Sequence, residues 1–411
     1  MTVTRRAMIL GTLALAGCGA APAPAPRGTP RATGAARFRA VPNAGHAAWL
    51  RGFRARAIAS GLPAGVVDRG LAGAGFIPEV VRLDRNQTEN VRTLEDYLAI
   101  ATSDTRIADG RRELARRRAL LGQIEARYGV PANVVTAIWG LESRYGTRMG
   151  DIPVTSALST LAYDGRRGAF FERQLLAALR IQARGDIAPS RMLGSWAGAM
   201  GHTQFIPTTF EAYAVDFRGD GRRDIWAPND PTDALASAAA YLSRSGWRRG
   251  APWGLEVRVP AGLRGSSGSS RSVAAWRAAG VTRARGGTVP DHGTARLAIP
   301  QPGGPAFLTF ANARVLRRYN NSLKYVLGVG VLSDRIAGGP PLEQGFGRNA
   351  AGLTLAERKE IQRLLTRRGY DVGEADGVIG AKTEAAIRDF QRRAGLTVDG
   401  KATPALLRAL R

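Results

Sequence analysis

Hydrophobic residues recur every three or four positions over most of the chain between about residues 38 and 335, the spacing that amphipathic helices require. The pattern changes in residues 254–310, where short apolar runs at 256–259, 295–299 and 306–308 are separated by turns rich in glycine and proline. We therefore predict a mainly helical domain of the α+β class over residues 37–337. A small β-rich insertion is expected within it at about 254–310.

A second helical unit is predicted after a stretch rich in Gly, Pro and Asn at 338–351, which we interpret as a linker. Within residues 352–411 the pattern predicts three helices, at 355–368, 381–394 and 403–410. Two Asp-Gly turns precede the second and third helices, and we expect Thr383 and Thr403 to cap them. The predicted core of this unit consists of Ile361, Leu364, Leu365, Ile387, Phe390, Leu406 and Leu407.

The N-terminus has the pattern of an export signal. Basic residues in the first six positions precede a short apolar run at 7–16, which is too short to span a bilayer as a helix. Cys18, the only cysteine, follows Leu-Ala-Gly, as in a bacterial lipoprotein signal whose cysteine becomes the lipidated mature N-terminus. We predict such a signal at 1–18 and an Ala/Pro-rich tether at 19–36. A plain cleaved signal with an incidental cysteine is the alternative.

The net charge of +26 gives limited information about the binding partner. Charge on this scale favours an anionic partner, such as a wall polymer, a membrane surface or a nucleic acid. Arginine supplies nearly all of it, however, and a GC-rich genome produces the same bias. Zinc-finger spacings and Walker loops are absent from the sequence, which argues against nucleic-acid and nucleotide binding.

One predicted helix, at 132–144, carries a candidate catalytic carboxyl group. Ile138 lies on its apolar face, and Glu142 follows at helical spacing on the edge of that face. Burial would raise the pKa of this carboxyl, which is what a general acid near neutral pH needs. A rim glutamate paired with Arg144 or Arg148 fits the same spacing, so the helix pattern alone leaves both roles open.

Two long motifs narrow this choice. They are IWGLESRYG at 138–146 and the glycine-rich LGSWAGAMGHTQFIPTTF at 193–210, accompanied by shorter motifs at 83–87, 163–167, 240–242 and 318–322. The motifs and their order along the chain resemble those of the membrane-bound lytic murein transglycosylase B family (glycoside hydrolase family 103). Residues 352–411 resemble the three-helix peptidoglycan-binding module of wall enzymes. The resemblance implies a lysozyme-like catalytic domain followed by that module.

The resemblance also implies an activity: cleavage of peptidoglycan between N-acetylmuramic acid and N-acetylglucosamine, with formation of 1,6-anhydromuramic acid. Glu142 would be the catalytic acid/base. The implied substrate-binding residues are Ser195, Gln204, Tyr241, Tyr319, Tyr325, Arg166 and Arg167. Core packing is the alternative for the tyrosines, and a solvated surface pair is the alternative for the arginines. His202 stands where relatives often carry tyrosine, and we assign it no role.

Residues 216–227 have the spacing of an EF-hand loop, as in some family members. Asp216, Asp220 and Asp224 are its candidate ligands, but Arg218 and Ala227 occupy two positions where a carboxylate is expected. This departure argues against calcium binding. No cofactor is expected to be required.

Three functions are therefore weighed: a lytic transglycosylase for wall remodelling, a muramidase of the same fold that uses water, and a catalytically idle peptidoglycan-binding lipoprotein. The expected partners are glycan strands and a membrane, reached through the lipid anchor, but no nucleic acid. The expected location is the periplasm, at the outer membrane.

Overall fold

The computed structural model describes residues 37–86 and 92–411. The predicted signal, Cys18 and the tether lie outside these residues, as does Gln87 of the first short motif. None of the helices in the two described ranges is long and apolar enough to cross a membrane. The described chain divides into two compact units: unit 1 holds residues 92–137 and 242–411, and unit 2 holds residues 37–86 and 138–241.

Unit 2 is built almost entirely of helices. They are α2 (Ala44–Ala59), α3 (Ala64–Leu71), α4 (Pro78–Arg85), α9 (Val154–Asp164), α10 (Gly168–Ala183), η1 (Pro189–Arg191) and α11 (Pro207–Tyr213). Two-residue strands β1 (Ile152–Pro153) and β2 (Leu193–Gly194) pair in antiparallel fashion. Helices α8 (Ala132–Ser143) and α12 (Thr232–Arg244) have residues in both units.

Helix α9 forms the centre of unit 2. Its residues from Val154 to Ala162 are all buried, and it packs against α10, α4 and α2. The sequence allows this because small and apolar side chains surround the whole helix, which is the composition of a buried helix rather than an amphipathic one. Gly165, in the left-handed conformation with φ of 82°, ends it.

In unit 1, helix α15 (Leu323–Ile336) has the corresponding central place, with its residues from Tyr325 to Ser333 buried. It packs against α5 (Leu94–Ala101), α6 (Asp104–Arg116) and α14 (Ala311–Tyr319). Thr93 and Ser103 cap α5 and α6 through their side-chain oxygens, which accept backbone N–H groups that no residue within the helix could pair. Helix α7 (Arg118–Tyr128) follows α6 and ends at Gly129.

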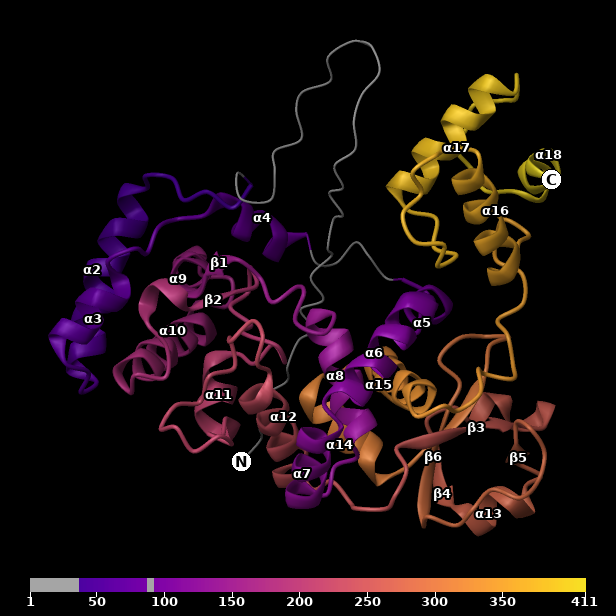
Figure 1. The fold of residues 1–411 in the computed structure, drawn as a ribbon, viewed down its shortest axis with the longest axis horizontal. Helices are drawn as coiled ribbons and strands as arrows, with labels where there is room; N and C mark the ends of the chain where they lie inside the picture. The colour runs from indigo at the N-terminus through magenta and orange to yellow at the C-terminus, as the bar shows by residue number, and fades with distance from the viewer. Residues whose placement is uncertain (1–36, 87–91) are drawn as a thin grey trace. The chain divides into compact units, whose positions relative to one another are not determined.

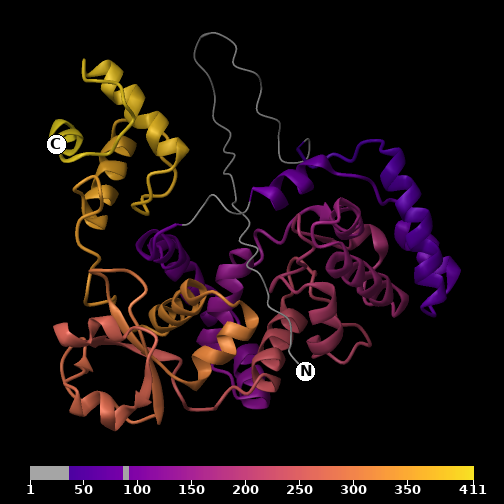
Figure 2. The same ribbon diagram turned by 180° about the vertical axis from the view of Figure 1, so that it is seen from behind.

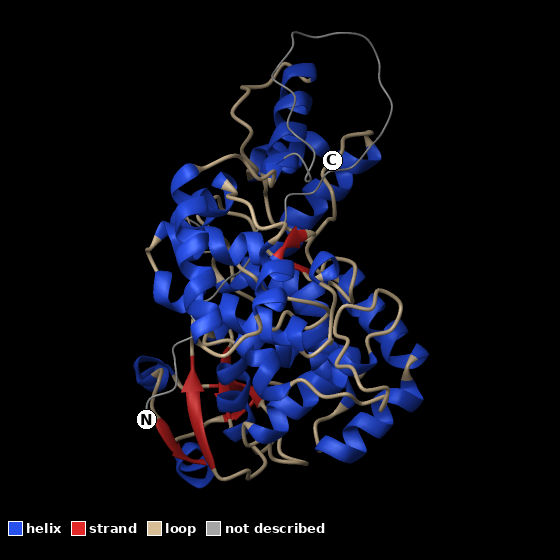
Figure 3. Cartoon of the chain, turned by 90° about the vertical axis from the view of Figure 1, so that its left-hand side faces the viewer, coloured by secondary structure: helices blue, strands red, loops and turns tan. Residues whose placement is uncertain are grey.

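The β-rich part of unit 1 is a five-stranded antiparallel sheet with the order β4-β6-β7-β3-β5. Its strands are β3 (Gly254–Arg258), β4 (Ser270–Ser272), β5 (Thr282–Arg283), β6 (Thr294–Ala298) and β7 (Ala306–Thr309). The sheet, whose strands are red in Figure 3, lies beside α13 (Val273–Ala278) in Figure 1. Together they enclose their own core around Trp276, Val257 and Leu308. The predicted mainly helical fold with a small sheet is confirmed. Strands β4 and β5 escaped prediction because all their residues are exposed.

The last three helices are α16 (Leu355–Arg367), α17 (Ala381–Arg393) and α18 (Pro404–Leu410), drawn in yellow tones in Figures 1 and 2. The predicted core residues of this part are buried in one cluster, with Leu364 partly buried at its edge. Gln362 and Gln391 each accept the backbone N–H of the glycine in one Asp-Gly turn, so the repeated turn is held in the same way twice.

Of the two expected threonine caps, one is correct. Thr403 caps α18 by accepting the N–H of Leu406. The expectation for Thr383 is wrong, because Gly380 is the N-cap of α17 and Thr383 lies within that helix, buried, with its hydroxyl donating to the carbonyl oxygen of Val372. The hydroxyl therefore binds the segment that precedes the helix and does not cap the helix end.

Candidate active site

Glu142 lies in the last turn of α8, and its side chain is half-buried. The face that it borders is apolar: Val135 and Ile138 are completely buried. The helix ends at Ser143, one residue earlier than predicted, because Arg144 and Tyr145 have left-handed backbones with φ of 50° and 57°. The carboxyl group is therefore held where a buried helix face meets an abrupt turn.

Unusual backbone conformations gather in this region. In residues 37–86 and 92–411, the only residues other than glycine with positive φ are Arg144, Tyr145 and Gln204. Each costs on the order of 1 kcal/mol or more, so such conformations persist only where surrounding contacts enforce them, and they concentrate at functional sites. All three fall within the two long sequence motifs.

His202 joins the end of α8 to two other segments. The indole N–H of Trp139 donates to His202 Nδ1 at 3.1 Å, and His202 Nε2 donates to the carbonyl oxygen of Ala227 at 2.8 Å. The hydroxyl of Ser143 donates to the carbonyl oxygen of His202 at 2.6 Å. With Nδ1 accepting and Nε2 donating, the ring is the neutral tautomer. This role could not be predicted from the sequence, since the two hydrogen-bond partners of the ring lie 63 and 25 residues away.

The glycine-rich loop at 193–206 carries two predicted substrate-binding residues, Ser195 and Gln204, both half-buried. The hydroxyl oxygen of Ser195 accepts the N–H of Ala199 at 3.1 Å. The side-chain amide of Gln204 donates to the carbonyl oxygens of Met149 at 3.0 Å and Gly201 at 2.9 Å. Gln204 thereby ties this loop to the turn that follows Glu142.

Ser195 and Gln204 each keep one hydrogen-bonding function uncommitted. Among the described residues, nothing accepts a hydrogen bond from the Ser195 hydroxyl and nothing donates one to the side-chain oxygen of Gln204. A donor and an acceptor on one loop are the complement of a secondary amide, which offers one C=O and one N–H. The loop is therefore equipped to bind an amide-bearing ligand.

Gly150 shows how closely the turn and the loop pack. A Cβ atom at this position would lie 2.2 Å from the carbonyl carbon and oxygen of Gly194 and 2.6 Å from the nitrogen of Ser195. Only a residue without a side chain permits this approach, and the φ of 89° favours glycine as well. The end of α8, residues 144–150 and the loop at 193–206 thus form one continuous site within unit 2.

The three predicted tyrosines fall in different places. Tyr241 belongs to unit 2, where its ring contacts Phe205 and Tyr213 at centroid distances of 6.1 and 4.4 Å. Tyr319 and Tyr325 belong to unit 1 and stack on each other with their rings 6.2 Å apart and nearly parallel. All three side chains are buried, so each one contributes to a core. Contact with a sugar stays a prediction for them.

Arg166 and Arg167 bind a carboxylate of their own unit. Both guanidinium groups donate to Asp84, at 2.6 and 2.7 Å, and the Asp84 side chain is only 1% exposed. Arg85 similarly pairs with Asp164 at 2.5 Å. The structure therefore joins the short motifs at 83–87 and 163–167 through ion pairs. A further contact of the arginines with substrate stays a prediction.

The EF-hand-like loop uses arginine where a metal site would need carboxylates. Asp216 accepts the N–H groups of Gly219, Asp220 and Gly221, and Arg218 forms an ion pair with Asp230. Arg223 is buried in an ion pair with Asp186. The part of the chain that the structure describes contains no group of three or more acidic, His or Cys side chains placed to hold a metal ion. These residues do not fit a calcium site.

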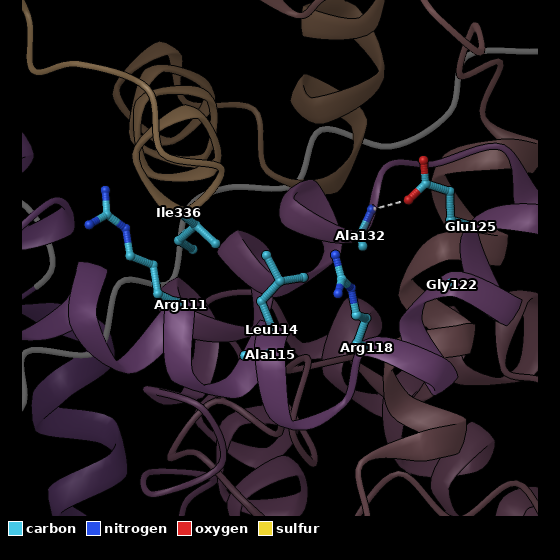
Figure 4. A pocket seen from close by; sticks show the side chains of 8 residues that line it. All are labelled: Arg111, Leu114, Ala115, Arg118, Gly122, Glu125, Ala132 and Ile336. Carbon is cyan, nitrogen blue, oxygen red and sulfur yellow. Dashed lines mark hydrogen bonds between the residues drawn. The ribbon is translucent and has the colours of Figure 1, made fainter.

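A separate cavity of about 590 Å³ lies in unit 1 (Figure 4). Its lining consists of Arg111, Leu114, Ala115, Arg118, Gly122, Glu125, Ala132 and Ile336, none of which was a predicted site residue. Glu125 accepts the N–H of Ala132 at 3.0 Å and so satisfies the start of α8, as the dashed line in Figure 4 shows. The cavity is therefore lined in part by the first residue of the helix that carries Glu142.

A half-buried glutamate stands at the end of a helix, and the turn that follows it packs against a loop that can bind an amide. This is the arrangement expected of a lysozyme-like enzyme that acts on amino-sugar polymers. Comparison with known proteins agrees. The family model described as transglycosylase SLT domain matches residues 45–334, and the model described as putative peptidoglycan binding domain matches residues 354–410. This chain belongs to the transglycosylase SLT family of lytic transglycosylases, enzymes that act on peptidoglycan.

Similar individual proteins are known. SltB3 from Pseudomonas aeruginosa, solved in complex with NAG-anhNAM-pentapeptide, is 46% identical, with a TM-score of 0.72 over 90% of this chain and 100% of that one. Slt35 from Escherichia coli in complex with bulgecin A is 28% identical, with a TM-score of 0.62 over 70% and 92% of the two chains. Membrane-bound lytic murein transglycosylase B of Escherichia coli K12 is 33% identical over 51% of this chain, and the match spans 58% of that protein's length.

Proposed function

We propose that this protein is a lytic transglycosylase that cleaves the β-1,4 bond between N-acetylmuramic acid and N-acetylglucosamine in peptidoglycan and leaves 1,6-anhydromuramic acid ends. The observation that carries the proposal is the site around Glu142, where one carboxyl group is held beside a loop with amide-binding functions. The complex of SltB3 with NAG-anhNAM-pentapeptide supports the proposed product.

The proposed reaction needs one carboxyl group in two roles. Glu142 first donates its proton to the bridging oxygen as the bond from C1 of the muramic residue breaks, and the 2-acetamido oxygen assists at C1. The Glu142 carboxylate then accepts the proton of the 6-hydroxyl as O6 bonds to C1 and closes the anhydro ring. No water is consumed. General acid/base assistance of this kind is worth roughly 10²–10⁴-fold in rate.

Ser195 and Gln204 are proposed to hold the acetamido groups of the substrate. The Ser195 hydroxyl can donate to an acetamido oxygen, and the side-chain oxygen of Gln204 can accept an acetamido N–H. Both side chains are already fixed by other hydrogen bonds, so little freedom is lost when the sugar binds. An acetamido group held in this way is also placed to assist at C1.

The remaining parts of the chain are proposed to bring the enzyme to its polymer. Residues 352–411 would bind the wall, residues 338–351 would link them to the catalytic domain at 37–337, and Cys18 would carry the lipid anchor. The lipobox pattern at 15–18 supports export to the periplasm and attachment to the outer membrane. The role in the cell would be remodelling and turnover of the wall.

The test is mass spectrometry of the products that the chain releases from purified peptidoglycan. We expect anhydromuramic ends from the parent, which is the chain without substitutions. The rate at which these products are released should fall at least about a hundredfold for Glu142→Gln. Glu211→Gln is the matched control: it makes the same change in unit 2, at a residue paired with Arg180, and should retain activity.

Two other results would favour the alternatives. Reducing muramic ends from the parent would identify a muramidase that uses water. Binding to peptidoglycan without cleavage would identify a wall-binding lipoprotein, with Glu142 as a structural residue.

A further inference from the structure

Arg148 lies inside the candidate site, in the turn that follows Glu142. Its backbone N–H donates to the carbonyl oxygen of Ser143 at 2.9 Å. The next residue, Met149, accepts the hydrogen bond from Gln204, and Gly150 packs directly on Gly194 and Ser195. The half-buried side chain of Arg148 therefore belongs to the segment that joins Glu142 to the proposed sugar-binding loop.

The guanidinium of Arg148 has no partner within residues 37–86 and 92–411. It forms neither a hydrogen bond nor an ion pair there, whereas other arginines of unit 2 bind carboxylates: Arg166 and Arg167 bind Asp84, and Arg223 binds Asp186. Its nitrogens are also not among the side-chain atoms sealed from solvent without a partner. The group is thus reachable and uncommitted.

The surroundings of Arg148 disfavour its positive charge. Burial lowers the pKa of the guanidinium below its ordinary value, and the positive charge of Arg144 lowers it further. An arginine nevertheless stays protonated at neutral pH. The fold therefore keeps the partly desolvated cation of Arg148 next to a second cation, and a bound anion would lower the cost of holding Arg148 charged there.

We propose that Arg148 binds a carboxylate of the peptide stem and makes this enzyme selective for strands with anionic stems. This proposal rests on the proposed function. In strands with intact stems the lactyl acid of the muramic residue is consumed in an amide bond, so the carboxylates lie in the peptide. The planar fork of arginine suits a carboxylate in bidentate geometry. Two structures of SltB3 contain a pentapeptide on the sugar.

The assignment differs from the one that the sequence suggested for Arg166 and Arg167. Those two guanidinium groups already bind the buried carboxylate of Asp84, and releasing them would leave that carboxylate without its pairing. Arg148 can bind an anion without breaking any interaction of the described chain.

The experiment compares two substrates and four chains. One substrate is purified peptidoglycan, and the other is the same material with its carboxylates converted to amides by a carbodiimide and excess ammonia. The chains are the full-length parent, Arg148→Gln, Arg148→Lys and the control Arg173→Gln, which removes one exposed arginine of α10. The release of anhydromuramic products gives kcat and KM for each combination.

We expect amidation to lower kcat/KM of the parent roughly tenfold or more, mainly through KM, because a hydrogen bond between charged groups is lost. Arg148→Gln should show a loss of similar size on unmodified peptidoglycan and no further loss on the amidated form. Arg148→Lys should recover part of the preference, and Arg173→Gln should behave like the parent. High salt should reduce the preference of the parent.

Two results would overturn the proposal: a parent that cleaves both substrates equally well, or an Arg148→Gln chain that loses the same factor on both. A parent that yields no anhydromuramic product from either substrate would instead contradict the proposed function. In that event, the affinities of Glu142→Gln and Glu142→Gln/Arg148→Gln for the two polymers still decide the role of Arg148. Equal affinities of the two chains for unmodified peptidoglycan would overturn it.

Discussion

Two glycines of unit 2 separate the effect of backbone conformation from the effect of crowding. Gly150 and Gly219 both have left-handed backbones, with φ of 89° and 76°. A Cβ atom at Gly150 would collide with the backbone of Gly194 and Ser195, whereas one at Gly219 would meet nothing within 4 Å. Substitution by alanine therefore adds the same kind of strain at both positions but a steric clash at only one.

We predict that Gly219→Ala lowers the free energy of unfolding by about 1–2 kcal/mol, the cost of a left-handed backbone for alanine. Gly150→Ala should cost roughly 1–3 kcal/mol more, because the clash forces the turn away from the loop. It should also reduce product release, because Ser195 and Gln204 shift. Urea unfolding and product analysis of both variants provide the measurement. Equal losses in the two chains would contradict the steric explanation.

His202 offers a second prediction at the residue scale. His202→Phe keeps an aromatic ring but leaves the indole N–H of Trp139 and the carbonyl oxygen of Ala227 unpaired, at a cost of about 1–3 kcal/mol each. Because these bonds hold the end of α8, we expect kcat to fall more than KM rises. His292→Phe, at an exposed histidine of unit 1, is the control. An unchanged kcat in a stable His202→Phe chain would show that Glu142 does not depend on this clamp.

At the scale of elements, the ion pairs of Asp84 connect α4 to the turn between α9 and α10. Burial by itself would raise the pKa of Asp84, but hydrogen bonds from Arg166 and Arg167 outweigh it and lower the pKa below its ordinary value. A lowered pKa in the folded state means that the carboxylate stabilises the fold at pH values above its unfolded pKa, about 3.9. This stabilisation is lost as the pH falls through the lower, folded pKa.

We therefore predict that Asp84→Asn lowers the free energy of unfolding by about 3 kcal/mol at pH 7, because both arginines lose a buried partner. The difference from the parent should shrink as the pH falls below about 4, because Asp84 is then protonated in the unfolded chain, and it should vanish once the pH is below the lower, folded pKa. Urea unfolding at a series of pH values measures it. Asp68→Asn, at an exposed ion pair with Arg54, should have a much smaller effect. A difference that stays constant down to the lowest pH would refute the linkage.

At the scale of the whole molecule, the net charge of +26 matters for binding to an anionic polymer. Salt screens such attraction, since the screening length falls from about 10 Å at 0.1 M to about 3 Å at 1 M ionic strength. The charge is spread over many arginines, so no single substitution would remove the effect. It should act on capture of the polymer and not on the bond-breaking step.

We predict that the affinity of Glu142→Gln for purified peptidoglycan falls about tenfold or more between 0.05 and 0.5 M salt. Sedimentation of the polymer with bound protein measures this directly. Amidated peptidoglycan should bind more weakly and show a smaller dependence on salt. Binding that does not respond to salt would mean that the arginine content has no part in wall attachment.

Properties that depend on neighbouring residues could be predicted from the sequence. Periodicity located the helices and the main strands, and the repeated Asp-Gly turn located the helical unit at 352–411. Helix faces, strand alternation and turns are all properties of local spacing. The two long motifs singled out Glu142, Ser195 and Gln204, which lie in segments that the fold brings together. Strands β4 and β5 and the role of Thr383 were missed, because exposed strands lack alternation and a threonine hydroxyl has several possible acceptors.

Which side chains already have hydrogen-bonding or ionic partners, and which do not, depends on the folded structure. Asp84 meets Arg166 across 82 positions, and Trp139 meets His202 across 63, so no local pattern could pair them. The absence of a pair is equally invisible in the sequence, where Arg148 looks like any other arginine. That Arg148 has no partner among the described residues is known only once the positions of the carboxylates in the folded chain are known. Pairing depends on distance in space and not along the sequence.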